Sequence, residues 1–214
     1  MKVLVVHGMF CTGRHTAALV AGLCREGLDA VGIELPGRGE GEFGLRDHVE
    51  FLKEQAGAAG ESAALLGHSM GGLICLLAAA ELADRPWLRK LALMGCAPPA
   101  TVNGFNLANL PAVLPAVIGP GSRHLMARRP YERLFMNRQD AELRLRVRRE
   151  LVSEPRALIR SIALPALDRG AVAHPRFACE PRFESIVLAG AGDRSTPPGL
   201  QRSIAKLLPG ARYE

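Results

Sequence analysis

The chain has 214 residues, of which 48% are hydrophobic and 22% charged, and its formal net charge is +6. This size and composition predict a globular protein, either one domain or one domain that carries an insertion, and they exclude a disordered chain. No apolar run reaches the length of a membrane span, and strand-like sequence starts at Lys2 without room for a signal peptide, so we expect a cytoplasmic protein.

The first part of the chain alternates between strands and helices. Residues 2–6 are apolar and rich in β-branched side chains, which is typical of a strand buried on both faces of a parallel sheet. The same criteria predict, in chain order, a helix over 14–26, a strand over 30–35, a helix over 46–57, a strand over 62–66, a helix over 71–83 and a strand over 89–94. This order predicts a parallel α/β sheet.

The alternation stops at Ala97. Prolines, an apolar stretch and arginine-rich helices follow, and the α/β pattern resumes at about residue 173 with a strand, a helix and the start of a further strand. We therefore predict one core built from residues 1–96 and 173–214. Residues 97–172 are expected to form a helical lid, inserted at the carboxyl edge of the sheet where such folds place their active sites.

The predicted lid is strongly basic. Between Gly121 and Glu150 it carries nine arginines against four acidic residues. The arginines form either a solvated helix face or a docking patch for an anionic partner, such as a phosphopantetheinyl carrier protein, a lipid headgroup or a nucleic acid. No nucleic-acid-binding motif and no interleaved aromatic series accompany them, so we do not expect nucleic-acid binding.

The five cysteines are widely spaced along the chain. They form no C-x-x-C pair and no cluster with histidines, so the sequence predicts neither a metal site nor a cofactor. Cys24, Cys75 and Cys96 lie in apolar stretches and are expected to be small buried side chains.

The sequence Gly-His-Ser-Met-Gly at residues 67–71 lies between a predicted strand and a predicted helix. Its glycines suit a reversal that is too tight for side chains, with Ser69 held in a strained conformation at the apex. The free N–H groups at the start of the helix would favour a developing negative charge there. The pattern G-x-S-x-G is typical of a nucleophile elbow, whereas the alternative is a serine that only caps the helix.

Three further motifs follow predicted strands: His-Gly at 7–8, Leu-Pro-Gly-Arg-Gly at 35–39 and Gly-Asp at 192–193. With the elbow at 67–71, in this order, they make the chain resemble the α/β-hydrolase superfamily over essentially its whole length. The resemblance implies an α/β-hydrolase fold, in a compact member without the two antiparallel leading strands. Serine at the apex of the elbow argues against dehalogenases and epoxide hydrolases, which carry aspartate there.

The resemblance implies a role for four residues. Ser69 is the candidate nucleophile, and Asp193 is the candidate acid that would orient and stabilise the base. Alternatively, Asp193 caps the helix that begins near Thr196. The oxyanion hole is expected from the backbone N–H groups of Met70 and Met9, with Phe10 as a substitute for Met9. Asp168 is a rival acid that fits the pattern less well.

The catalytic base is harder to place. The family order puts a histidine after the acid, but every histidine of this chain precedes Asp193. His7 is expected to brace the oxyanion loop, and His68 is expected to point away from the hydroxyl of Ser69. We therefore expect the catalytic histidine to lie beyond Glu214.

The other four histidines are weaker candidates for the base. His15 and His48 lie on predicted helices and are expected at the surface. His124 and His174 belong to the predicted lid or its hinge, and either could serve only through an unusual geometry.

These expectations lead to a serine hydrolase that cleaves a carboxylic ester or a thioester of a small-molecule acyl substrate. The apolar stretch over 105–119, including Leu107, would line the acyl site or would simply pack the lid. The motifs at 35–39 and 67–71 also look like the type II thioesterases of polyketide and peptide synthesis, which makes carrier-bound acyl chains an alternative. A non-hydrolytic acyltransferase or binding protein is the second alternative. The oligomeric state is not predicted.

Overall fold

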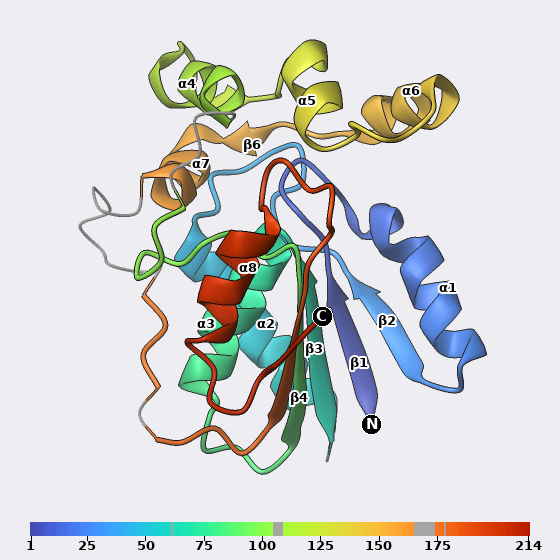
Figure 1. Cartoon of the computed structure of the whole chain (residues 1–214), viewed down its shortest axis with the longest axis vertical. Helices are drawn as coiled ribbons and strands as arrows, with labels where there is room; N and C mark the ends of the chain where they lie inside the picture. The colour runs from blue at the N-terminus through green and yellow to red at the C-terminus, as the bar shows by residue number, and fades with distance from the viewer. Residues whose placement is uncertain (61, 105–108, 165–173, 178) are drawn as a thin grey trace.

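A computed structural model describes the whole chain except residues 61, 105–108, 165–173 and 178. Its centre is a six-stranded sheet with the strand order β2-β1-β3-β4-β7-β8, in which every pair of neighbours is parallel (Figure 1). The strands are β1 (Lys2–Val6), β2 (Asp29–Ile33), β3 (Ala63–His68), β4 (Leu88–Met94), β7 (Glu184–Leu188) and β8 (Arg212–Tyr213). The predicted parallel sheet is confirmed.

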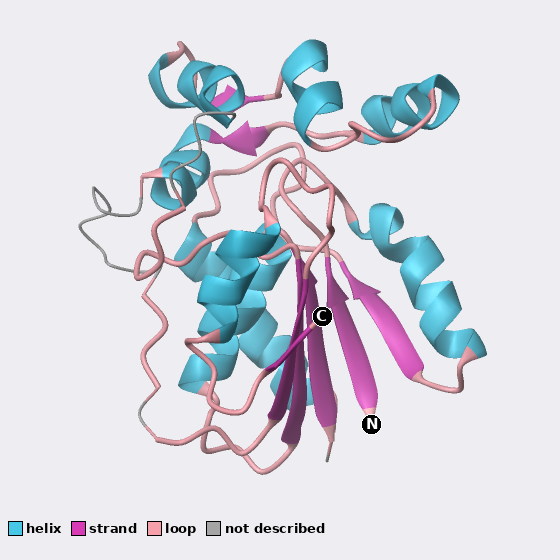
Figure 2. Cartoon of the chain, viewed as in Figure 1, coloured by secondary structure: helices cyan, strands magenta, loops and turns pink. Residues whose placement is uncertain are grey.

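Helices cover both faces of this sheet (Figure 2). Side chains of α1 (Ala17–Arg25), which follows the 3-10 turn η1 (Gly13–Thr16), pack against Val3 and Val5 of β1. The opposite face, with Leu4 and Val6, packs against α2 (Leu45–Ala58), α3 (Met70–Glu81) and α8 (Pro198–Ala205). Because side chains alternate between the two faces of a strand, β1 is apolar throughout.

The helix α3 is the most buried helix of the core. Every residue from Met70 to Ala80 is buried, because α3 lies between the sheet and α2. This position explains why its sequence is apolar around the whole circumference. On α2, Val49, Leu52 and Ala56 lie on one side of the helix and are buried.

The helical insertion lies between β4 and β7, over the carboxyl edge of the sheet (Figure 1). Its elements are α4 (Leu110–Ile118), β5 (Arg123–His124), α5 (Arg128–Leu134), α6 (Ala141–Glu150), β6 (Glu154–Pro155) and α7 (Arg156–Ala163). Strands β5 and β6 pair antiparallel in a small second sheet. The predicted insertion is confirmed. Part of the predicted range 97–172, including Asp168, lies outside the described residues.

The cysteines only partly follow the sequence prediction. Cys75 and Cys96 are buried, whereas Cys24 on α1 is exposed, so the prediction for Cys24 was wrong. The described residues contain no cluster of histidine, cysteine or acidic side chains that could hold a metal ion. None of the helices placed by the structure is long and apolar enough to cross a membrane.

Candidate active site

Ser69 stands at the apex of the turn between β3 and α3. Its φ of 54° and ψ of −119° place it in a conformation that residues with a side chain rarely adopt, and Phe10 is the other non-glycine residue with positive φ in the described chain. A Cβ on Gly67 would lie 2.6 Å from the nitrogen of Gly72, and one on Gly71 would lie 2.5 Å from the carbonyl oxygen of His7. Both glycines are therefore required by the close approach of backbone to backbone.

The strained apex is held from both sides. The N–H of Ser69 donates to the carbonyl of Met94 at the end of β4, at 3.1 Å. Its own carbonyl accepts the N–H of Ala97 at 3.0 Å and that of Leu73 at 3.2 Å. The side chain is half-buried. Backbone strain of this kind, about 1–3 kcal/mol, persists only where neighbouring contacts fix the conformation.

The loop after β1 lies directly against the elbow. A Cβ on Gly8 would lie 3.2 Å from the Cβ of Ser69, so a larger residue would require the elbow to shift by a few tenths of an ångström. Among the described residues, neither the N–H of Met9 nor that of Met70 has a hydrogen-bond acceptor. The N–H of Phe10, by contrast, donates to a carboxylate of the insertion. Met9 therefore remains the predicted partner of Met70, and the substitute Phe10 is engaged elsewhere.

His7 braces this loop, as the sequence suggested. Its Nε2 accepts the N–H of Leu35 at 3.3 Å, so the proton resides on Nδ1, which donates to the carbonyl of Gly8 at 2.9 Å. Burial lowers the pKa of His7 to about 4. The imidazole is therefore neutral at pH 7 and links the loops after β1 and β2.

Asp193 occupies a turn after β7. Its Oδ1 accepts the N–H groups of Ser195 and Thr196, each at 2.8 Å, and its Oδ2 accepts the hydroxyl of Thr196 at 2.7 Å. These contacts stabilise the turn that leads into α8 and also hold the carboxylate in one orientation. Asp193 does not cap α8, because the helix begins at Pro198 with Pro197 as its N-cap, and no side chain caps it. The contacts leave the role as catalytic acid a prediction.

His68 lies between the loop after β1 and the turn after β7. A Cβ on Gly8 would lie 3.2 Å from its Nδ1, and one on Gly95 would lie 4.0 Å from its Cδ2 and 3.2 Å from Oδ2 of Asp193. His68 is exposed to solvent, yet the protein atoms around its ring lower its pKa, while the Asp193 carboxylate opposes this shift. The candidate nucleophile, the oxyanion loop and the candidate acid thus meet around His68.

Three other histidines make their contacts with residues other than Ser69 and Asp193. His15 accepts the N–H of Thr12 at 3.0 Å, and the ring of His124 lies 6.4 Å from that of Phe10. His48 was predicted at the surface, and this was wrong, because its side chain is fully buried beside Arg38. In the part of the chain that the structure describes, no hydrogen bond joins a histidine to Ser69 or Asp193.

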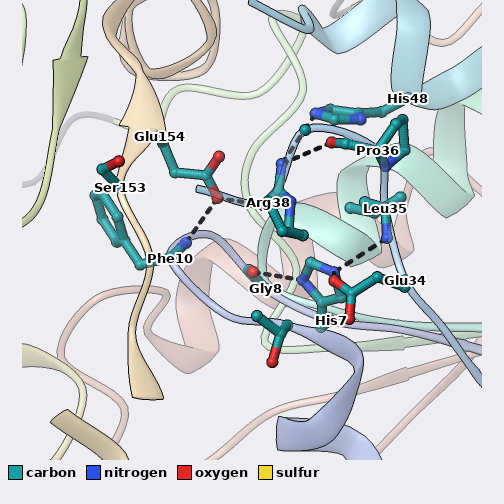
Figure 3. A network of polar contacts seen from close by, with 12 residues as sticks. His7, Gly8, Phe10, Glu34, Leu35, Pro36, Arg38, His48, Ser153 and Glu154 are labelled. Atoms are coloured by element: carbon teal, nitrogen blue, oxygen red, sulfur yellow. Dashed lines mark hydrogen bonds and ion pairs between the residues drawn. The ribbon is translucent and has the colours of Figure 1, made fainter. Parts of the chain in front are cut away.

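The insertion contacts both sides of this site. Asn137 donates to the carbonyl of Gly192 at 2.9 Å, and Asn109 donates to the carbonyl of Ser195 at 3.0 Å. On the other side, Glu154 accepts the N–H of Phe10 (Figure 3). Sequence reasoning did not single out these three residues of the insertion, since none belongs to a motif.

The apolar helix α4 faces outward in part. Leu110, Leu114 and Ile118 are exposed, whereas Ala112 and Ala116, on the opposite side of the helix, pack in the cluster that contains Phe10. Because these three side chains are exposed, the lining of an acyl site by this stretch stays a prediction. Leu107 lies outside the described residues.

Comparison with known protein families gives a match over almost the entire chain. A model of the alpha/beta hydrolase family matches residues 3–214. A search of curated protein sequences found no match.

Solved structures agree in fold. A monoacylglycerol lipase from Paleococcus ferrophilus is 20% identical, with 99% of this chain and 82% of that chain covered and a TM-score of 0.70. A methylesterase from Arabidopsis is 14% identical, with 100% and 89% covered and a TM-score of 0.72. Polyneuridine aldehyde esterase is 16% identical, with 100% and 89% covered and a TM-score of 0.71. The predicted α/β-hydrolase fold is confirmed.

Proposed function

Because the chain belongs to the alpha/beta hydrolase family, we propose that it is a serine hydrolase that cleaves a carboxylic ester or thioester of a small-molecule acyl substrate. The observation that carries this proposal is the apex position of Ser69, at a φ of 54° between glycines that cannot carry a Cβ. The lipase and esterases of similar fold support the choice of ester chemistry.

In the proposed reaction, the hydroxyl oxygen of Ser69 attacks the acyl carbonyl and gives up its proton to a base. The N–H groups of Met9 and Met70 stabilise the resulting oxyanion, since both are free to donate in the described structure. Collapse of the tetrahedral intermediate expels the alcohol or thiol, which takes up the proton, and leaves an acyl-enzyme. Water then attacks the acyl carbonyl and gives up a proton to the base. Collapse of the second tetrahedral intermediate releases the carboxylic acid, and the oxygen of Ser69 takes the proton back.

Ser69 needs a base within hydrogen-bond reach, because a free hydroxyl is a poor nucleophile at neutral pH. In the described structure, no histidine forms a hydrogen bond with the hydroxyl of Ser69. We therefore do not assign the base to any of the six histidines. Asp193 would orient the base, and its fixed carboxylate supports this assignment.

A fluorophosphonate probe tests the proposal, because it reacts with activated serines. We expect the intact mass of the protein to increase by one probe adduct, and a peptide containing Ser69 to carry it. The variant Ser69→Ala should remain unlabelled. A folded protein whose Ser69 is not labelled would contradict the proposal and favour a binding protein.

The choice between oxygen ester and thioester is a finer question. Several arginines of the insertion are exposed, among them Arg128, Arg129, Arg133, Arg146 and Arg149, which would suit an acidic acyl carrier. Turnover of p-nitrophenyl butyrate should be compared with that of butyryl-CoA and of a butyryl carrier protein. A preference for the carrier that disappears at high salt would support the thioesterase, and the absence of any thioester preference would exclude it.

A further inference from the structure

Phe10 adopts a backbone conformation that is sterically unfavourable for a residue with a side chain. Its φ is 64°, in the left-handed region where a residue with a side chain is strained. The N–H of Cys11 donates to the carbonyl of Gly8 at 3.3 Å, which closes a four-residue turn with Met9 and Phe10 at its centre. A positive φ at the third residue of such a turn normally calls for glycine. Something outside the turn must therefore hold Phe10.

The hydrogen bonds that hold the backbone of Phe10 come from a single short segment of the insertion. The N–H of Phe10 donates to Oε1 of Glu154 at 2.9 Å, and its carbonyl accepts the N–H of Val152, also at 2.9 Å. The phenyl ring is buried in the cluster formed by the insertion, with Tyr131 and Ile159 among its members. Both peptide groups and the side chain of Phe10 are thus bound by residues far along the chain.

The carboxylate of Glu154 is itself held in place. It is fully buried and forms an ion pair with Arg38, which belongs to the turn after β2 (Figure 3). The guanidinium of Arg38 is also buried and lies 3.4 Å from the carbonyl of Pro36 and from Nε2 of His48. A buried ion pair contributes little net stability, because removing both charges from water costs about as much as their attraction returns. Its presence here calls for another explanation.

We infer that Glu154, oriented by Arg38, is a positioning residue that sets the conformation of the oxyanion loop through the N–H of Phe10. A carboxylate accepts N–H groups and repels carbonyl oxygens, so it selects one orientation of the Met9–Phe10 peptide in the turn. A flip of that peptide would exchange the directions of the Met9 carbonyl and the Phe10 N–H, and would alter the backbone of Met9. The inference rests on the proposed function, in which the Met9 N–H donates to the oxyanion.

Two double variants isolate the acceptor from the charge pair. Arg38→Met combined with Glu154→Gln keeps an oxygen acceptor for the Phe10 N–H, whereas Arg38→Met combined with Glu154→Leu removes it. Neither protein contains an unpaired buried charge from this pair, so the comparison avoids the main cause of misfolding. Glu150→Gln, which makes the same chemical change at an exposed glutamate of α6, is the matched control.

With p-nitrophenyl butyrate, we expect kcat of the Gln double variant to exceed that of the Leu double variant about tenfold or more, as for partial loss of an oxyanion donor. KM should agree between the two within about threefold, because the turn acts on the transition state. The control should keep the wild-type kcat. Equal kcat values for the two double variants would overturn the inference.

Amide hydrogen exchange provides a measurement that needs no activity. In the wild-type protein, the Phe10 amide should exchange as slowly as the buried amides of the insertion, and about tenfold or more faster in the Leu double variant. A rapidly exchanging Phe10 amide in the wild type would refute the positioning role even if the variants fail to fold. A protected Phe10 amide in a protein that hydrolyses no ester would refute the proposed function and leave the positioning of the turn intact.

Discussion

The hydroxyl of Thr196 donates to Oδ2 of Asp193 at 2.7 Å, while Oδ1 accepts two backbone N–H groups of the same turn. The carboxylate is therefore fixed by its own turn on both oxygens before any base approaches it. Its structural and its proposed catalytic roles use the same atoms, but they depend on different properties. Holding the turn needs an acceptor oxygen, whereas stabilising a protonated base needs the negative charge.

Substitutions of Asp193 separate these two roles. Asp193→Asn keeps one carbonyl oxygen for the turn, so it should lower the free energy of unfolding by no more than about 1 kcal/mol. Loss of the charge should slow the labelling of Ser69 by a fluorophosphonate on the order of 10²–10⁴-fold. Asp193→Ala should be less stable than Asp193→Asn. Labelling of the folded Asn variant at the wild-type rate would leave Asp193 only its role in holding the turn.

Replacing Ser69 tests the strain at the elbow. Ser69→Gly and Ser69→Ala both remove the hydroxyl, but only glycine adopts a φ of 54° without strain. The Gly variant should therefore be more stable than the Ala variant by about 1 kcal/mol in urea unfolding. A more stable Ala variant would mean that the apex is not strained in solution.

The close backbone contacts of the elbow make Gly71 irreplaceable. A Cβ there would overlap the backbone of Val6 and His7, so Gly71→Ala should destabilise the protein by several kcal/mol, roughly the upper range for single substitutions. Gly57→Ala on α2 is the matched control, because a Cβ there meets no atom within 4 Å. This control should raise stability by about 0.5–1 kcal/mol, as alanine favours the helix. Chemical denaturation measures both, and equal effects of the two substitutions would contradict the geometry.

The buried His48 makes stability depend on pH. Burial, with the nearby Arg38, lowers the pKa of His48 from 6.5 to about 4. Between these values the unfolded chain binds a proton that the native protein does not, so stability is present above pH 6.5 and is lost as the pH falls toward 4. His48→Gln should remove about 2 kcal/mol of the decrease between pH 7 and pH 5, seen in urea unfolding at each pH. His7, whose pKa is also lowered, should still contribute to the decrease in the variant. Identical slopes for variant and wild type would show that His48 does not titrate this way.

The Arg38–Glu154 pair should behave as a buried ion pair in a double-mutant cycle. Arg38→Met alone leaves a fully buried carboxylate without its cation and should cost about 3–5 kcal/mol of unfolding free energy. Adding Glu154→Leu should recover part of that loss, because both charges are then absent. Additive effects of the two substitutions would indicate that the pair is not formed in solution.

The features that the sequence predicted are those with a local signal. Apolar runs such as residues 2–6 identify strands that are buried on both faces, and the glycines around Ser69 identify a turn whose sterics exclude side chains. The His7 brace was also within reach, since its partners belong to loops that follow neighbouring strands.

The features that it missed depend on contacts between distant segments. Glu154 belongs to no motif, and nothing in its neighbourhood indicates that it would meet Phe10 and Arg38. The burial of His48 could not be read from its helix alone, because the side chain that covers it comes from another loop. Cys24 was predicted to be buried because its neighbours in sequence are apolar, but its side chain on α1 is exposed.

The link between Phe10 and Glu154 spans 144 positions of the chain, which bears on the order of assembly. The strand and the loop that carry Phe10 are synthesised long before the segment that holds them. The parallel pairing of β1 with β3 and the turn at Ser69 can form while Glu154 has yet to be synthesised. The turn that carries Phe10 can therefore reach its final conformation only after residues 152–154 have been synthesised.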